Sequence, residues 1–148
     1  MDRGTMLTEN RQFVEGLIIK LLRAVPLSAL PDAVIFGSAA ITLGGIDLER
    51  KVDDLDVFIS ETTFSQLVKD GQAEEYEKSP GVWALKIPRV AKVELLKTFP
   101  GVSHDGVLKR AKSHDSGLCV GSMEDLRTWK RTQGRKKDWA DLERMKSS

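Results

Sequence analysis

Residues 34–57 read VIFGSAAITLGGIDLERKVDDLDV, and this stretch decides the fold. Its first three residues are apolar and favour a short buried strand that stops at Gly37-Ser38. The residues that follow predict a helix over 39–43, which the pair Gly44-Gly45 ends. The alternation of side chains over 53–60 then predicts a second strand with different residues on its two faces.

The sequence on either side of this stretch predicts a mixed α/β (α+β) fold, with a short mixed β-sheet flanked by helices. Before it, apolar residues recur at helical spacing from about Thr8, the expected N-cap, to about Ala24. After it, helices are expected over 64–69, 106–112, 122–131 and 136–145, and strands over 82–87, 90–96 and 118–120. The last helix is expected to turn Trp139, Leu142 and Met145 toward the core.

Length and composition favour one globular domain. The chain has 148 residues, of which 41% are hydrophobic and 30% charged, so it can bury a sizeable core. The single cysteine, Cys119, excludes an intramolecular disulfide framework and offers no zinc-site spacing. No apolar run approaches ~20 residues, and the N-terminus does not lead into a signal-peptide core. The sequence therefore predicts a cytoplasmic protein without membrane contact.

The charge of the chain is divided between its two halves. Residues 1–80 carry 8 Lys and Arg against 14 Asp and Glu, whereas residues 81–148 carry 15 against 8. An acidic half joined to a basic half suggests that a polyanion is handled with a divalent metal between them. Solvated helix faces are the alternative explanation for the same pattern.

Three carboxylates form a candidate metal site. Asp54 and Asp56 are two residues apart on an expected strand, so they project from one face, about 7 Å apart along the backbone. Two like charges this close raise each other's pKa unless a cation lies between them, and Mg²⁺ suits carboxylate oxygens. With Glu94 on another strand, they could form a two-metal site for phosphoryl transfer. A polar strand face, or an ion pair at Glu94, is the alternative.

The turn at Gly37-Ser38 is a candidate phosphate site. A strand that ends in Gly-Ser and opens a helix presents backbone N–H groups and a hydroxyl at the positive end of that helix. Glycine also allows a phosphate to approach the backbone closely. A plain connection between strand and helix is the alternative, and the order of strand, turn, helix and paired acids favours the phosphate site.

These motifs together resemble the signature of the nucleotidyltransferase superfamily, whose fold is shared with DNA polymerase β. The matching residues are 36–40 (FGSAA), Gly44, Arg50, 53–57 (DDLDV) and the later acid Glu94. The resemblance is narrowest to the minimal nucleotidyltransferases and the AbiE-type toxin nucleotidyltransferases. Residues 120–126 (VGSMEDL), Lys130 and 134–142 (GRKKDWADL) are similar to the tail of AbiE-type enzymes, so the resemblance spans about residues 33–143.

The resemblance implies a site and a division of the chain. The implied metal-binding and catalytic residues are Asp54, Asp56 and Glu94. The implied nucleotide-binding residues are Gly37, Ser38, Arg50, Lys130 and Lys137, with Asp138 fixing a neighbouring lysine or the helix. One nucleotidyltransferase-like domain over 1–148 would comprise an N-terminal helix over about 8–24, a catalytic core over about 33–98 and a basic helical part over about 104–146.

The resemblance also implies an activity. The protein would use Mg²⁺ or Mn²⁺ to move an NMP unit from a nucleoside triphosphate (NTP) to an acceptor hydroxyl. The acceptor would be the 3′ end of an RNA, tRNA above all, or a protein side chain, in a toxin–antitoxin or phage-defence setting. Positioning and electrostatic stabilisation of phosphoryl oxygens would carry most of the catalysis.

The sequence departs from the family pattern at three points. Glu94 stands where aspartate is commoner, and Val52 stands where many relatives have a hydroxyl residue. The chain ends at Ser148, where the larger toxin relatives continue into a helical domain associated with acceptor binding. The acceptor or partner is therefore expected to dock on the basic C-terminal face or on another chain.

Two further functions fit parts of the sequence. The first is a protein of the same fold that binds a nucleotide or a partner protein without chemistry, as an antitoxin or regulator. The second is a basic nucleic-acid-binding module with an incidental acidic strand. His104 and His114 are interpreted as loop or capping residues and Cys119 as a core residue. Trp129 is interpreted as a packing residue, with base stacking as the alternative.

Overall fold

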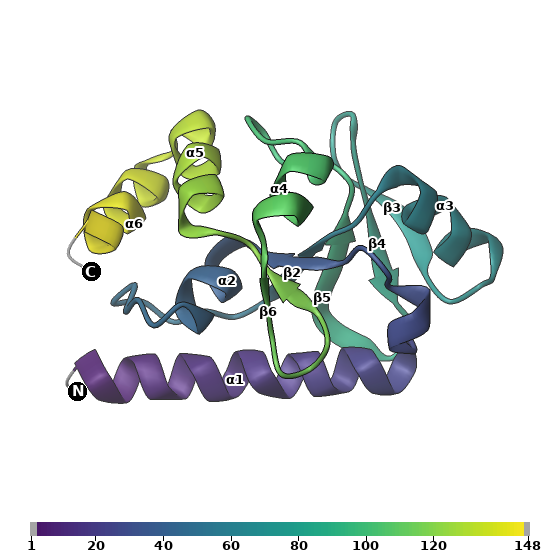
Figure 1. Ribbon diagram of the computed structural model, residues 1–148, viewed down its shortest axis with the longest axis horizontal. Helices are drawn as coiled ribbons and strands as arrows, with labels where there is room; N and C mark the ends of the chain where they lie inside the picture. The colour runs from purple at the N-terminus through teal and green to yellow at the C-terminus, as the bar shows by residue number, and fades with distance from the viewer. Residues whose placement is uncertain (1–2, 147–148) are drawn as a thin grey trace.

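The computed structural model describes residues 3–146 and confirms the mixed α/β architecture (Figure 1). The helices are α1 (Arg3–Ala24), the short 3-10 helix η1 (Leu27–Ala29), α2 (Gly37–Leu43), α3 (Glu61–Lys69), α4 (His104–Arg110), α5 (Met123–Gln133) and α6 (Lys136–Lys146). The strands are β1 (Val34–Phe36), β2 (Leu55–Phe58), β3 (Glu74–Ser79), β4 (Val82–Ile87), β5 (Val90–Leu96), β6 (Lys112–Ser113) and β7 (Cys119–Val120). Over this range they form one mixed seven-stranded sheet in the order β3-β4-β5-β2-β1-β7-β6.

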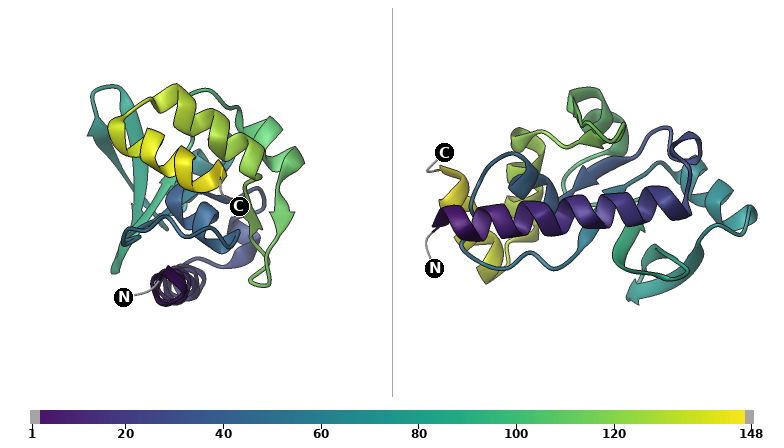
Figure 2. Two further views of the ribbon diagram at one scale, coloured as in Figure 1. Left: turned by 90° about the vertical axis from the view of Figure 1, so that its left-hand side faces the viewer. Right: turned by 90° about the horizontal axis from the view of Figure 1, so that it is seen from below.

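Helices cover both faces of the sheet. The long helix α1 runs along one side of the molecule, and α4, α5 and α6 lie on the opposite side (Figure 1, Figure 2). The core between these layers is made of fully buried apolar side chains from every central strand, such as Ile35, Val57 and Leu95. Within the described part of the chain, no helix is both long enough and apolar enough to cross a membrane.

The first helix begins earlier than predicted. It starts at Arg3, and Thr8 lies inside it, so the assignment of Thr8 as the N-cap is wrong. A tertiary contact holds the N-terminal half of the helix: the buried amide of Asn10 donates to the backbone oxygen of Arg50 and accepts from the backbone N–H of Val52. The early turns of α1 are thereby tied to the segment before β2, which apolar spacing alone does not indicate.

The register of the sheet places the acids on one face. Asp56 in β2 is the Cα partner of both Glu94 in β5 and Phe36 in β1. Because directly paired residues point to the same side of a sheet, these three side chains share a face. The ring of Phe36 lies 5.6 Å from that of Trp129 in α5, so this is the face that α5 covers in part.

Most other elements agree with the sequence, but two strands were not predicted. The strands over 34–36, 82–87 and 90–96 have the expected bounds. The strand over 74–79 reads EEYEKS and is mostly exposed at the edge of the sheet. It lacks an apolar face because an edge strand can be paired on one side and solvated elsewhere. The two-residue strand β6 is equally exposed.

The predicted orientation of Trp139 in the last helix is wrong. Leu142 and Met145 are buried as expected, whereas Trp139 is 52% exposed. Asp138 and Asp141 take positions on the buried side instead, with at most 1% of each residue exposed. Sequence patterns assign acids to solvent, and these two are buried because they have cationic partners: Lys130 for both acids, and Arg50 for Asp141.

Candidate functional site

The three predicted carboxylates lie together on the sheet. Asp54 immediately precedes β2, Asp56 lies within it, and Glu94 lies at the paired position of β5. One carboxylate oxygen from each residue lies within 4.8 Å of the other two. Oxygen donors in this arrangement are the ligands that Mg²⁺ and Mn²⁺ prefer. The geometry therefore fits a divalent cation held between the two strands.

The electrostatics of the cluster also fit a cation. Burial, together with the negative charges of Asp54 and Glu94, raises the pKa of Asp56 to about 7, against the opposing effect of Lys78 and Lys137. Burial and the charge of Asp54 also raise the pKa of Glu94. One buried oxygen of Asp56, Oδ1, has no hydrogen-bond partner among residues 3–146. A buried acceptor without a partner is costly, and a cation would satisfy it.

The raised pKa of Asp56 predicts a pH dependence of stability without metal. The folded state retains a proton that the unfolded state releases above about pH 4, so the free energy of unfolding falls as the pH rises from about 4 to about 7. Asp56→Asn removes this loss, and its melting temperature in EDTA should exceed that of the wild type by several degrees at pH 8. Parallel melting-temperature profiles for the two proteins between pH 4 and 8 would contradict the prediction.

Gly37 lies against the side chain of Asp56. It is the first residue of α2 and has a φ of +69°, which glycine adopts readily and other residues rarely do. A Cβ placed on Gly37 would lie 3.2 Å from Oδ2 of Asp56. The glycine thus allows the helix start and the carboxylate to approach each other closely.

Gly37→Ala is expected to lower the free energy of unfolding by about 1–2 kcal/mol, because alanine is strained in the left-handed conformation. It should also weaken Mn²⁺ binding, since the new methyl group pushes against Asp56. Gly45→Ala is the matched control: its φ is +90°, but its Cβ would meet nothing within 4 Å. Denaturation and Mn²⁺ titration should show a stability loss for both variants and a loss of metal affinity for Gly37→Ala alone.

A pocket of about 510 Å³ opens beside the acids. Asp54, Asp56 and Ser38 line it at the sheet and the start of α2. The β3–β4 hairpin contributes Lys78, and the α5–α6 region contributes Lys137 with other polar residues. The pocket is thus acidic where it meets the sheet and basic on the two opposing walls, which suits a phosphate chain bound together with a divalent cation.

Lys78 is a site residue that the sequence analysis missed. Its Nζ lies 2.9 Å from Oε1 of Glu94, and the two side chains are 40% and 21% exposed. The residue belongs to β3, the unpredicted edge strand. The only sequence signal was a lysine directly after Tyr76 and Glu77 in a charged run, which does not indicate its partner.

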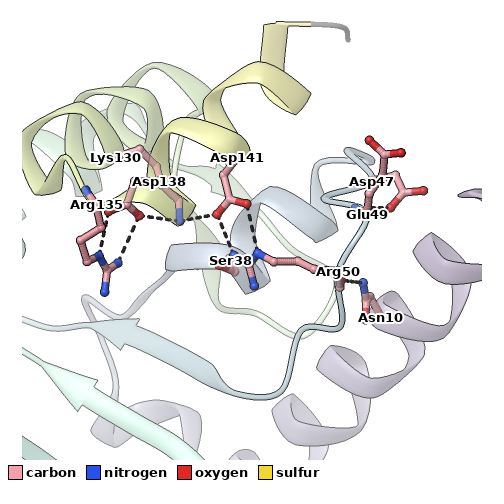
Figure 3. A network of polar contacts seen from close by, with 9 residues as sticks. All are labelled: Asn10, Ser38, Asp47, Glu49, Arg50, Lys130, Arg135, Asp138 and Asp141. Atoms are coloured by element: carbon pink, nitrogen blue, oxygen red, sulfur yellow. Dashed lines mark hydrogen bonds and ion pairs between the residues drawn. The ribbon is translucent and has the colours of Figure 1, made fainter.

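A network of ion pairs fixes the C-terminal helices to the start of α2 (Figure 3). Its members, in order along the contacts, are Arg135, Asp138, Lys130, Asp141, Arg50 and Ser38. The ammonium of Lys130 is fully buried, 3.2 Å from Asp138 and 2.7 Å from Asp141. Burial raises the pKa of Asp138, but hydrogen bonds from Arg135 and Lys130 outweigh it and lower the pKa below its usual value.

The network changes the interpretation of two predicted nucleotide-binding residues. Arg50 donates from Nη2 to Oγ of Ser38 over 2.7 Å and forms a two-point contact with Asp141. Arg50 therefore contacts Ser38 directly and orients its hydroxyl. Lys130 also borders the pocket, but its ammonium is paired with the carboxylates of Asp138 and Asp141. It therefore belongs to the ion-pair network. Lys137, in contrast, is exposed and lines the pocket without an ion pair inside the described range.

The remaining singled-out residues have contacts elsewhere in the fold. His104 bonds to the backbone oxygen of Asp32, and His114 contacts Glu15 and Ser116. Trp129 is 5% exposed and packs among aromatic rings at the edge of the pocket. Trp129 has the packing role expected for it, and His114 lies in the loop between β6 and β7, whereas His104 lies in α4 and contacts a distant residue instead of capping a helix.

Comparison of the chain with protein-family models, with curated proteins and with solved structures finds no match.

Proposed function

We propose that this protein is a divalent-metal-dependent nucleotidyltransferase that moves an NMP unit from an NTP to an acceptor hydroxyl. The observation that carries the proposal is the convergence of Asp54, Asp56 and Glu94 beside a pocket with basic walls. Clustered carboxylates repel one another, and a protein without a cation at this position has no need of them. The motif resemblance to nucleotidyltransferases supports the same activity.

The cation would be held by Asp54, Asp56 and Glu94. The donor set is all oxygen, and Oδ1 of Asp56 is buried without another partner, so Mg²⁺ or Mn²⁺ fits. When bound, the metal would neutralise phosphoryl oxygens and favour the deprotonated form of the acceptor hydroxyl.

The residues of the chain would bind and orient the triphosphate. Ser38 presents its hydroxyl at the start of α2, held by Arg50. Lys137 and Arg135 supply positive charge from the opposite wall. These contacts would place the α-phosphorus beside the acids and stabilise the charge that spreads over phosphoryl oxygens in the transition state.

The proposed reaction breaks one bond and forms another. The acceptor oxygen bonds to the α-phosphorus, the bond from that phosphorus to the bridging oxygen of the β-phosphate breaks, and pyrophosphate leaves. Glu94 would accept the hydroxyl proton. Exposed cations on α5 and α6, including Arg131 and Lys136, favour RNA over a protein side chain as the acceptor.

The experiment supplies each of the four α-labelled NTPs with Mg²⁺, total tRNA and cell extract. Label should pass into RNA or one protein band, with stoichiometric pyrophosphate, and EDTA should prevent it. Nucleotide binding without transfer would favour the non-catalytic alternative instead. Absence of both binding and transfer with all four NTPs would contradict the proposal.

A further inference from the structure

Lys78 is the cation in contact with the acidic cluster. Among the ion pairs formed by residues 3–146, its 2.9 Å contact with Glu94 is the only one that involves a member of the cluster. Lys78 also lines the pocket beside Asp54 and Asp56. The ammonium therefore stands between the carboxylates that would hold a metal and the space that would hold a phosphate chain.

The ion pair compensates only part of the negative charge of the cluster. Lys78 contacts Glu94, while Oδ1 of Asp56 remains buried without a partner. One ammonium carries a single positive charge, and a divalent cation would interact with all three acids at once. An ammonium and a divalent cation beside the same carboxylate oxygen also repel each other.

The side chain of Lys78 is partly exposed and belongs to an irregular part of the edge strand. Lysine carries its charge on a flexible four-carbon stem, and 40% of the side chain of Lys78 is exposed. The pairing of β3 with β4 shifts register between Glu77 and Ser79, so Lys78 lies at an irregularity of the edge strand. The ammonium is thus partly open to solvent and lies outside a regular ladder, which allows it to leave Glu94.

We infer that Lys78 is an exchangeable counter-ion: it neutralises Glu94 before a divalent cation binds, is displaced by that cation, and then contacts the polyphosphate in the pocket. The inference rests on the proposed metal and triphosphate site and adds a residue to it. One side chain would thus oppose binding of the metal alone and support binding of the metal together with phosphate.

Lys86 provides a matched control. It is the Cα partner of Glu94 on β4 and points to the same face of the sheet. Its ammonium, however, lies 3.7 Å from Glu74, and both of these side chains are more than half exposed. Lys86→Met removes the same charge from the same face without removing a contact of the cluster.

The first experiment measures Mn²⁺ affinity by electron paramagnetic resonance for the wild type, Lys78→Met, Lys78→Arg and Lys86→Met, with circular dichroism to verify folding. Lys78→Met should bind Mn²⁺ about tenfold more tightly, because no competing charge has to leave. Lys78→Arg should bind Mn²⁺ no more tightly than the wild type, since a guanidinium pairs well with a carboxylate. Lys86→Met should stay within about twofold of the wild type.

The second experiment measures inorganic tripolyphosphate affinity at saturating Mg²⁺ by calorimetry. Lys78→Met should bind about tenfold more weakly, because one cation is lost from the phosphate contacts. Lys78→Met is thus expected to strengthen Mn²⁺ binding and to weaken tripolyphosphate binding. This pair of opposite effects distinguishes an exchangeable counter-ion from a structural lysine, whose loss would not strengthen Mn²⁺ binding.

Three outcomes would overturn the inference. The first is unchanged or weaker Mn²⁺ binding by Lys78→Met, and the second is an equal gain in Lys86→Met. The third is unchanged tripolyphosphate binding by Lys78→Met. If the wild type binds Mn²⁺ and tripolyphosphate in these cases, the metal site stands and only the role of Lys78 fails. If neither the wild type nor Lys78→Met binds Mn²⁺, the metal site and the inference fail together.

Discussion

Replacing Asp56 by asparagine is expected to reduce label transfer by about 10³-fold or more, the scale of losing one central electrostatic contact in an active site. The asparagine amide would keep the shape of the side chain and remove the charge, so the cation would lose a charged ligand that has a buried oxygen. The variant should remain folded, and in EDTA at pH 8 it should be more stable than the wild type. Transfer and melting temperature would therefore change in opposite senses.

The control for this prediction is Asp53→Asn. Asp53 is the exposed neighbour of the cluster and is not among the residues whose oxygens converge. Its transfer rate should remain within about twofold of the wild type, because exposed charges contribute little. Equal transfer rates for Asp56→Asn and the wild type would refute a catalytic role for the cluster.

Lys130→Met is expected to destabilise the fold by about 3–5 kcal/mol, the typical cost of removing one partner from a buried ion pair. The ammonium is fully buried between Asp138 and Asp141, and its removal leaves two carboxylates with less compensation. For a chain of this size, the melting temperature should fall by about 10 °C. Differential scanning calorimetry at pH 7 measures the change.

Lys137→Met serves as the comparison for Lys130→Met. Lys137 lies on the same pair of helices but is exposed, so its loss should alter the melting temperature by less than about 2 °C and weaken tripolyphosphate binding instead. The two lysines that the sequence assigns to the nucleotide would thus separate into a structural residue and a binding residue. A small stability change for Lys130→Met would show that the network around it is dispensable.

Local sequence patterns were sufficient for the parts of the site that lie close together in the chain. The apolar run before Gly37, the glycine pair after α2 and the alternation around Asp56 each reflect a local backbone preference. They predicted the strand and the position of the first two acids, whereas α2 begins at Gly37, two residues before the predicted start of the helix. The third acid, Glu94, was found because an acid between apolar strand residues is unusual.

Long-range contacts limited the rest of the prediction. The pairing of Asp56 with Glu94 depends on a parallel register between strands that spacing cannot specify. Lys130 and Asp141 have the composition of a solvated helix face, and their ion pairs with each other and with Asp138 and Arg50 explain their burial. Lys78 was not predicted as a site residue because its edge strand has no apolar face, so the strand itself was not predicted.

The most direct test of the account is the anomalous diffraction of crystals grown with Mn²⁺ and an α,β-methylene NTP, which cannot release pyrophosphate. We predict an anomalous peak about 2 Å from carboxylate oxygens of Asp54 and Asp56, with the phosphates extending toward Ser38 and Lys137. A cluster without Mn²⁺ at millimolar concentrations, or a nucleotide bound on another face, would contradict the account.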